Sequence, residues 1–211
     1  MRFNEIVELF ENARADLYHG TLLVYAEKII AANTMHAKMP IRSKDIPAEV
    51  KGQTKTVSFS RSKAAAEDYS KNTMDHPGMV STVLVFDQDR LKQMVGNRLR
   101  PYDDIPTPAY AASYAAANRG AAVPKRRYRK DAEEVVFGDI VGINKCIKKI
   151  IIIPTGSARD IRQNNAAILR SPLLKDPRTV IQYFDDDFNE QILSPQEYVD
   201  FISVPGNVRS D

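Results

Sequence analysis

The run CIKKIIII, residues 146–153, constrains the fold more than any other part of the sequence. Its isoleucines are β-branched, which favours an extended backbone on a pleated surface. Pro154 follows directly and ends the run, because proline lacks the N–H that a strand ladder needs. We therefore expect the strongest strand of the chain here, and a fold built around a sheet.

The remaining elements follow from short apolar patterns with recognisable ends. We expect further strands over residues 16–21, 56–60, 79–86, 134–137 and 179–184. We expect helices over residues 3–13, 22–33, 63–70, 87–95, 158–169 and 194–202, with Asp87 as one N-cap and Ser194 with Pro195 beginning the last helix. Strands and helices do not alternate as in βαβ units, so the order favours the α+β class over a doubly wound parallel sheet.

Composition sets the outer limits on function. With 211 residues, 43% hydrophobic and 27% charged, the chain suits one sizeable core or a core with a modest appendage. No run approaches the roughly 18 to 20 apolar residues of a membrane helix, and the acidic, amphipathic start does not resemble a signal peptide. Cys146 is the only cysteine, which excludes an internal disulfide and a multi-cysteine metal site. We expect a cytoplasmic protein with no membrane partner.

Three short segments carry the chemistry of interest: LYHGT at residues 17–21, VSFS at residues 57–60 and EEVVF at residues 133–137. Each has an ordinary structural interpretation when taken alone. A strand histidine is usually hydrogen-bonded within the fold, serines are common on an exposed strand face, and glutamate commonly begins a strand at the surface. The order of the three segments is the more informative feature.

In this order the segments resemble the ADP-ribosyltransferase superfamily, in the branch with histidine on the first strand and glutamate on a late one, as in diphtheria toxin and the poly(ADP-ribose) polymerases. The resemblance covers roughly residues 16–153. It implies an α+β split β-sandwich with flanking helices, with a catalytic domain at residues 1–154 and a C-terminal extension, residues 155–211, packed on the same domain. It also implies transfer of a single ADP-ribose unit from NAD, with release of nicotinamide and without a metal.

The resemblance assigns roles to the first two segments. His19 would hydrogen-bond a ribose hydroxyl of NAD, and the Gly20 backbone would hold the nicotinamide carboxamide, where a side chain would block close approach. Thr21 ends the strand beside them, so that the strand's end forms the pocket wall. Ser58 and Ser60 would line the pocket of the nicotinamide ribose.

The third segment holds the expected catalytic residue. Glu134 stands where the family places its catalytic glutamate, immediately before an apolar strand. Glu133 is the competing assignment, because adjacent strand residues face opposite sides and only one of them points into the site. Such a carboxylate stabilises the positive charge that develops when the ribose–nicotinamide bond breaks.

Two further roles have several candidates. Tyr69 or Tyr18 would stack against nicotinamide, although the polymerase branch has a conspicuous tyrosine on or after its second strand, where this chain has VSFSRS. Arg61, which follows the pocket serines, competes with Arg98 and Arg100 for the pyrophosphate of NAD.

The acceptor is a macromolecule whose class the sequence leaves open between protein and nucleic acid. In the basic run KRRYRK, Arg126 and Arg127 precede Tyr128, and Arg129 and Lys130 follow it. The run suits phosphates with an aromatic ring to stack a base, and suits a solvated surface equally well. A toxin, a phage effector and a bacterial modifying enzyme all fit such a chain. The alternatives are an RNA 2′-phosphotransferase, which shares the LYHGT opening, and a non-catalytic module that binds NAD or ADP-ribose. The sequence does not indicate an oligomeric state.

Overall fold

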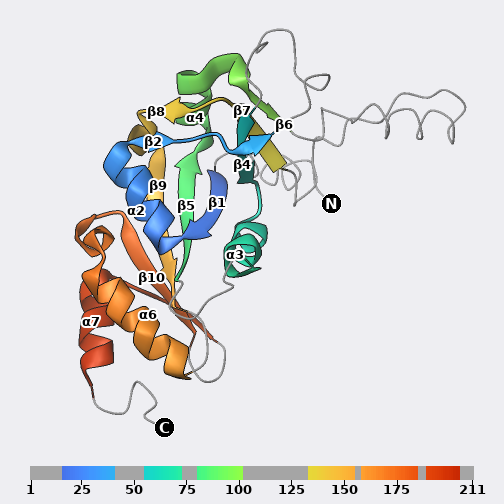
Figure 1. Ribbon diagram of the computed structural model, residues 1–211. Helices are drawn as coiled ribbons and strands as arrows, with labels where there is room; N and C mark the ends of the chain where they lie inside the picture. Colours follow the sequence, from blue (N-terminus) through green and yellow to red (C-terminus); the bar gives the residue numbers. More distant parts are fainter. Residues whose placement is uncertain are drawn as a thin grey trace, which may run out of the picture. The chain divides into compact units, whose positions relative to one another are not determined.

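The computed structural model describes residues 16–40, 55–72, 80–101, 133–154, 158–184 and 189–204. These residues fall into two compact units that interleave along the chain (Figure 1). Of the described residues, the first unit takes 16–17, 33–40, 55–62, 87–101 and 133–145. The second unit takes 18–32, 63–72, 80–86, 146–154, 158–184 and 189–204. Each unit is described by itself below.

The first unit is built on an antiparallel sheet. Strand β7 (Glu133–Phe137) lies between β4 (Lys55–Ser60) and β6 (Leu99–Pro101), and the short β3 (Met39–Pro40) pairs with the other side of β4. The β4–β7 register runs from Thr56 opposite Phe137 to Ser60 opposite Glu133. The apolar side chains of both strands are buried, and they make a small core for this unit. A separate two-stranded ladder joins β2 (Thr34–Met35) to β8 (Ile140–Val141).

Helix α4 (Gln88–Val95) begins and ends as its sequence predicts. The Asp87 carboxylate accepts a hydrogen bond from the backbone N–H of Arg90 at 3.0 Å, which confirms Asp87 as the N-cap. Gly96 ends the helix with φ of 55°, a left-handed conformation that glycine adopts without strain. A short 3₁₀ helix, η3 (Gly96–Arg98), then leads into β6. The start of α4 is therefore fixed at Gln88.

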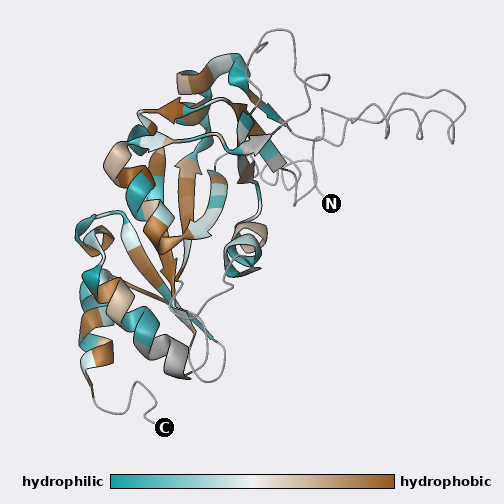
Figure 2. Ribbon diagram, in the orientation of Figure 1, coloured by the Kyte–Doolittle hydropathy of each residue, from teal (hydrophilic) through white to brown (hydrophobic). Residues whose placement is uncertain are grey.

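The second unit contains the predicted central strand. Strand β9 (Ile147–Ile153) pairs antiparallel with β5 (Ser81–Asp87) on one side and parallel with β10 (Thr179–Phe184) on the other. Strand β1 (Asp16–Leu22) lies beyond β5, and β11 (Glu190–Leu193) pairs antiparallel with β10. Figure 2 shows β5 and β9 as largely hydrophobic, in keeping with their burial. Parallel and antiparallel pairs thus coexist, and the α+β class is confirmed.

Four helices accompany these strands: α2 (Leu23–Ala32), α3 (Lys63–Asn72), α6 (Ala158–Arg170) and α7 (Pro195–Ser203). Ser194 begins α7 with a capping box, in which its hydroxyl accepts from the N–H of Glu197 and the Glu197 carboxylate accepts from the N–H of Ser194. Tyr198 is 1% exposed and donates to Asn165 Oδ1 at 2.5 Å. Its burial raises the pKa of the Tyr198 hydroxyl. The contact docks α7 on α6.

Most expected elements are present where the structure describes the chain. The sequence did not predict the short strands β2, β3, β6, β8 and β11, and the helix expected over residues 3–13 lies outside the described residues. Because β10 pairs directly with β9, the C-terminal strands extend the sheet of the second unit. The boundary at residue 154 stays a prediction. None of the helices within the described ranges is long and apolar enough to cross a membrane.

Gly20 lies where β1 meets the backbone of α3. A Cβ atom at this position would stand 1.9 Å from the carbonyl oxygen of Ala66 and 3.2 Å from the backbone nitrogen of Ser70. Since both are main-chain atoms, a changed side-chain rotamer cannot make room. The glycine therefore permits close packing of strand on helix, a physical reason for glycine here that the sequence did not indicate.

We expect Gly20→Ala to destabilise the protein, because β1 and α3 must separate to admit the methyl group. Overpacking of this kind costs about 1–3 kcal/mol, and more where backbone atoms collide. Urea denaturation of the variant measures the loss. Gly20→Ala combined with Ala66→Gly should be no more stable, since the obstructing atom belongs to the backbone. An unchanged denaturation midpoint for Gly20→Ala would show that the strand and helix are not in this close contact.

Candidate active site

Glu134 is a charged residue in the interior of the first unit. It occupies the second position of β7 and lies opposite Phe59 of β4 in the antiparallel register. Side chains directly opposite each other in such a ladder share one face of the sheet. Phe59 is 1% exposed and Glu134 only 3% exposed. A carboxylate so removed from water needs partners to offset its lost hydration.

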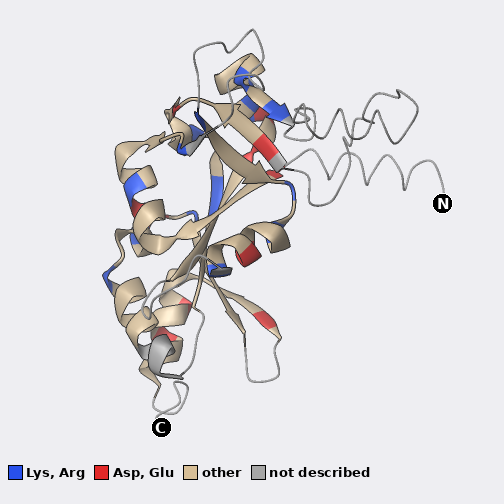
Figure 3. Ribbon diagram, turned by 45° about the vertical axis from the view of Figure 1, so that its right-hand side comes forward, with Lys and Arg blue, Asp and Glu red and all other residues tan. Residues whose placement is uncertain are grey.

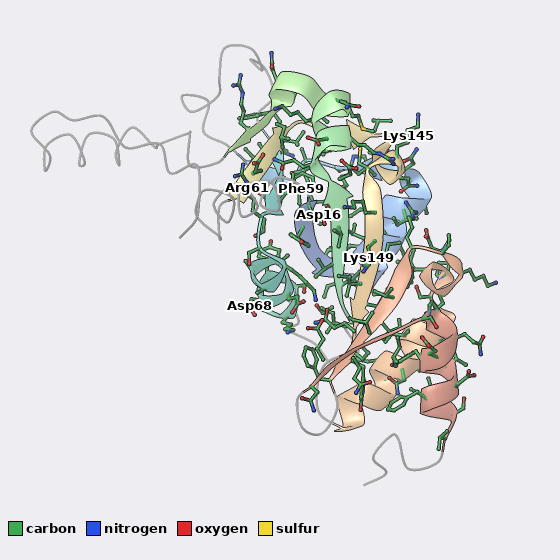
Figure 4. The ribbon with its side chains drawn as sticks, turned by 180° about the vertical axis from the view of Figure 1, so that it is seen from behind. Asp16, Phe59, Arg61, Asp68, Lys145 and Lys149 are labelled. Carbon is green, nitrogen blue, oxygen red and sulfur yellow. The ribbon has the colours of Figure 1, made fainter. Side chains whose placement is uncertain are left out.

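Two side chains supply those partners. Arg61, one residue beyond the end of β4, directs both Nε and Nη2 at Oε1 of Glu134, with Nε at 2.8 Å. Gln88, the first residue of α4, places Nε2 3.3 Å from the same oxygen. Figure 4 labels Arg61 and Phe59 near the end of β4 where the arginine leaves the strand. Three donor atoms from two elements therefore converge on a single carboxylate oxygen.

The two oxygens of the Glu134 carboxylate differ in their hydrogen bonds. Within the described residues, Oε2 receives no hydrogen bond, while Oε1 takes all three donors. An arginine more commonly binds a carboxylate through both oxygens, as a fork. The observed arrangement anchors one oxygen and leaves the other able to accept a hydrogen bond from a hydroxyl, or to stabilise positive charge.

The predicted pocket serines do not share the face of Glu134. Successive strand residues point to opposite sides, so Ser58 and Ser60 lie on the face of β4 opposite to Phe59. Ser60 is opposite Glu133 in the register, and its hydroxyl accepts a hydrogen bond from the backbone N–H of Ser62 at 3.0 Å. The structure thus brings Arg61 to Glu134, and it separates both from the two serines across the sheet.

Four residues of the LYHGT segment, from Tyr18 to Thr21, belong to the second unit. His19 and Thr21 are partly exposed on β1, while Gly20 between them is buried against α3. Tyr18 packs on a core cluster that includes Val83 and Ile151. Tyr69, the other stacking candidate, is 60% exposed on α3. Of the two tyrosines, Tyr69 has the more accessible ring.

The remaining basic candidates have different positions. Arg98 donates from Nη1 to the carbonyl oxygens of Phe137 and Asp139, at 3.1 and 2.8 Å, and so ties η3 to the turn after β7. Arg100 donates from Nε to the carbonyl of Asn97 at 3.0 Å. The predicted acceptor residues Arg126, Arg127 and Tyr128 lie outside the described residues.

Over the ranges that the structure describes, charged side chains are otherwise dispersed. Figure 3 shows acidic and basic residues interspersed along helices and strands rather than gathered by sign. The Asp139 carboxylate accepts hydrogen bonds from His36 and from the backbone N–H of Ala37, and these contacts lower its pKa. Across the ranges that the structure describes, no three His, Cys, Asp or Glu side chains are grouped to hold a metal ion.

The sequence did not predict that Gln88 contacts Glu134. The Asp87 cap predicts where α4 begins and hence that Gln88 is its first residue. Its contact with Glu134 joins positions 46 residues apart, and depends on how α4 packs beside β7. A local sequence pattern carries no signal for such a pairing.

No protein-family model matches the chain, and no curated protein matches it. Solved structures that resemble it include three of DarT from Thermus sp. 2.9. The complex with NAD+ has a TM-score of 0.42 and 16% identity, covering 80% of this chain and 96% of that one. The complex with carba-NAD+ has a TM-score of 0.40 and 13% identity, covering 83% and 97%. The complex with ADP-ribosylated ssDNA has a TM-score of 0.40 and 13% identity, covering 80% and 94%. At such low similarity, the chain's own residues must carry any functional conclusion.

We expect Arg61→Met to destabilise the protein by about 3 kcal/mol, because removal of one partner leaves a buried charge uncompensated. Urea denaturation measures the loss. Arg61→Met combined with Glu134→Gln should recover much of it, since the unpaired charge is then absent. Lys71→Met is the matched control: Lys71 pairs with Glu67 at 3.7 Å, is about one-third exposed, and should cost under about 1 kcal/mol. Equal, small losses for Arg61→Met and Lys71→Met would contradict the buried pair.

Proposed function

We propose that this protein is an NAD-dependent mono-ADP-ribosyltransferase, with Glu134 as its catalytic carboxylate and a macromolecule as its acceptor. The observation that carries the proposal is the asymmetric holding of Glu134: Arg61 and Gln88 engage Oε1, and Oε2 accepts nothing from the described residues. The order of LYHGT, VSFS and EEVVF along the chain supports the same function.

The chemistry needs a carboxylate of this kind. Cleavage of the bond between ribose C1′ and the nicotinamide nitrogen leaves its electron pair on nicotinamide, which departs neutral, while the ribose acquires oxocarbenium character. In our proposal Oε2 accepts a hydrogen bond from the 2′-hydroxyl of that ribose and stabilises the developing charge. Arg61 holds the carboxylate in place through Oε1, so that little reorganisation is needed during the reaction.

The second half of the reaction forms a new bond at C1′. An acceptor group attacks with its lone pair and loses a proton, which the Glu134 carboxylate receives and passes to water. One acceptor hydrogen leaves as a proton, one nicotinamide is released, and the ADP-ribose is joined to the acceptor. No oxidant, reductant or metal takes part in this balance.

Other residues would bind the ribose and nicotinamide groups of NAD. We propose that His19 hydrogen-bonds a ribose hydroxyl, that the Gly20 backbone and Thr21 hold the nicotinamide end, and that Tyr69 stacks on the ring. Ser58 and Ser60 stay candidates for the ribose pocket, and Glu133, which pairs with Ser60 in the backbone register, is the alternative catalytic residue.

The proposal extends to the class of acceptor and to the cellular compartment. Arg126 and Arg127 beside Tyr128 would suit a single-stranded nucleic acid, through phosphate contacts and base stacking, and an acidic protein surface would meet the same charges. The lone, buried Cys146 favours a reducing compartment, so we propose a cytoplasmic toxin, effector or modifying enzyme. A module that only binds NAD does not require a buried carboxylate that is anchored through one oxygen and can accept a hydrogen bond at the other.

The direct test is release of nicotinamide from NAD by purified protein, alone and with single-stranded DNA, RNA or lysate protein. Glu134→Gln should lower turnover at least about a hundredfold, because the neutral amide cannot stabilise positive charge. Glu133→Gln is the matched control, one residue away on the same strand, and should retain most of the activity. Labelled ADP-ribose found on one of the three acceptors identifies the acceptor class.

Three outcomes would contradict the proposal. A Glu133→Gln variant that loses turnover while Glu134→Gln keeps it would transfer the catalytic role to Glu133. NAD that binds without any release of nicotinamide would favour the binding module, and release of a 2′-phosphate from RNA would favour the 2′-phosphotransferase.

A further inference from the structure

We propose that Gln88 is a positioning residue for Glu134, kept in place at a cost to folding stability. This inference rests on the proposed function, because it assigns Gln88 a task in presenting the catalytic carboxylate. Gln88 touches no reacting atom in this account. Its effect passes through the orientation of Glu134.

The orientation of the Gln88 amide follows from its partner. An ionised carboxylate only accepts hydrogen bonds, so the NH₂ group of Gln88 must be the end that faces Oε1 of Glu134, at 3.3 Å. The carbonyl end must then point away from Glu134. Flipping the amide would set two acceptor oxygens against each other, so the observed orientation is the favourable one.

That orientation leaves a buried group without a partner. Within the described residues, Gln88 Oε1 is shielded from solvent and accepts no hydrogen bond. A buried acceptor that has lost water and gained nothing lowers stability, and this loss offsets what the 3.3 Å hydrogen bond from Nε2 contributes. An apolar side chain of the same shape removes both effects. Methionine matches glutamine closely in length and volume. For folding alone, methionine at position 88 would serve as well or better.

Arg61 alone does not fix the plane of the carboxylate. Its two donors both address Oε1, and rotation about the last side-chain bond of glutamate is broad, with no sharply preferred staggered positions. A donor that reaches Oε1 from α4 adds a second direction. Together the two directions define where Oε2 lies, and Oε2 is the oxygen that acts in the proposed reaction.

The chain contains a matched control for this chemistry. Gln182 on β10 is 1% exposed, donates from Nε2 to Oε1 of Glu67 at 3.2 Å, and also has a buried Oε1 that accepts no hydrogen bond from the described residues. The pair of Gln182 and Glu67 therefore repeats the geometry of Gln88 and Glu134. Neither Gln182 nor Glu67 has a role in the proposed reaction.

The experiment compares Gln88→Met with Gln182→Met in the full chain. Both variants should melt at the wild-type temperature or a few degrees above it. Only Gln88→Met should slow nicotinamide release, by about tenfold or more in kcat with KM for NAD unchanged, because a misplaced carboxylate affects the transition state and not substrate binding. A merely structural Gln88 would instead lower the melting temperature, and a Gln88→Met enzyme with wild-type kcat would overturn the inference.

A second measurement does not depend on activity. In side-chain amide NMR spectra, Glu134→Gln should shift the NH₂ resonances of Gln88 and leave those of Gln182 in place. Unmoved Gln88 resonances would overturn the positioning contact even in an active enzyme. If the wild-type protein released no nicotinamide while the Gln88 resonances did shift, the contact would stand, and the proposed function and the catalytic task of Gln88 would fall.

Discussion

The ion pair between Arg61 and Glu134 is the interaction on which the candidate site depends. Burial of a carboxylate opposite Phe59 is unfavourable by itself. The Arg61 guanidinium compensates the buried charge, because Arg61 follows the last residue of β4 and its side chain reaches across to Glu134 on β7. The strand register decides this geometry. A slip of one residue would put Glu134 on the other face of the sheet and break its ion pair with Arg61.

The way Arg61 binds Glu134 compensates the buried charge and still leaves one carboxylate oxygen able to accept a hydrogen bond. A carboxylate bound symmetrically by a guanidinium fork has both oxygens occupied, whereas here all three donor atoms from Arg61 and Gln88 address Oε1. The negative charge is compensated, and one oxygen keeps its capacity to accept. Stability is given up at Gln88, whose carbonyl is buried without a hydrogen bond in the described structure, a pattern typical of functional sites.

The sequence was a good guide to elements whose causes are local. Strand β9 follows from its isoleucines, the start of α4 from Asp87, and the start of α7 from the capping box at Ser194. It could not show that Gly20 lies against the backbone of Ala66, because that contact depends on the packing of a strand on a helix. Short strands such as β11 lack a pattern of their own and form because β10 provides an edge to pair with.

The candidate site was predictable in part for the same reason. The motif order indicated Glu134 and offered Arg61 as a pyrophosphate ligand, while the structure places Arg61 on the glutamate itself. Alternation along β4 already implied that Ser58 and Ser60 share a face, but only the register with β7 shows that this face is not that of Glu134. Gln88 was out of reach, since its contact joins a helix start to a strand 46 residues away.

The central claim is that Glu134, through Oε2, acts on the 2′-hydroxyl of the nicotinamide ribose. The most direct test is a cycle of single-turnover rates, with wild type and Glu134→Gln each acting on NAD and on an analogue whose nicotinamide ribose lacks that hydroxyl. For each substrate, the wild-type rate is divided by the Glu134→Gln rate, and the two quotients are compared. The comparison cancels the intrinsic reactivity of the analogue and leaves the coupling between the Glu134 carboxylate and the 2′-hydroxyl. We predict that Glu134→Gln is severely impaired with NAD and much less impaired with the analogue. Equal impairment with both substrates would mean that the carboxylate and the hydroxyl do not interact, and would contradict the account.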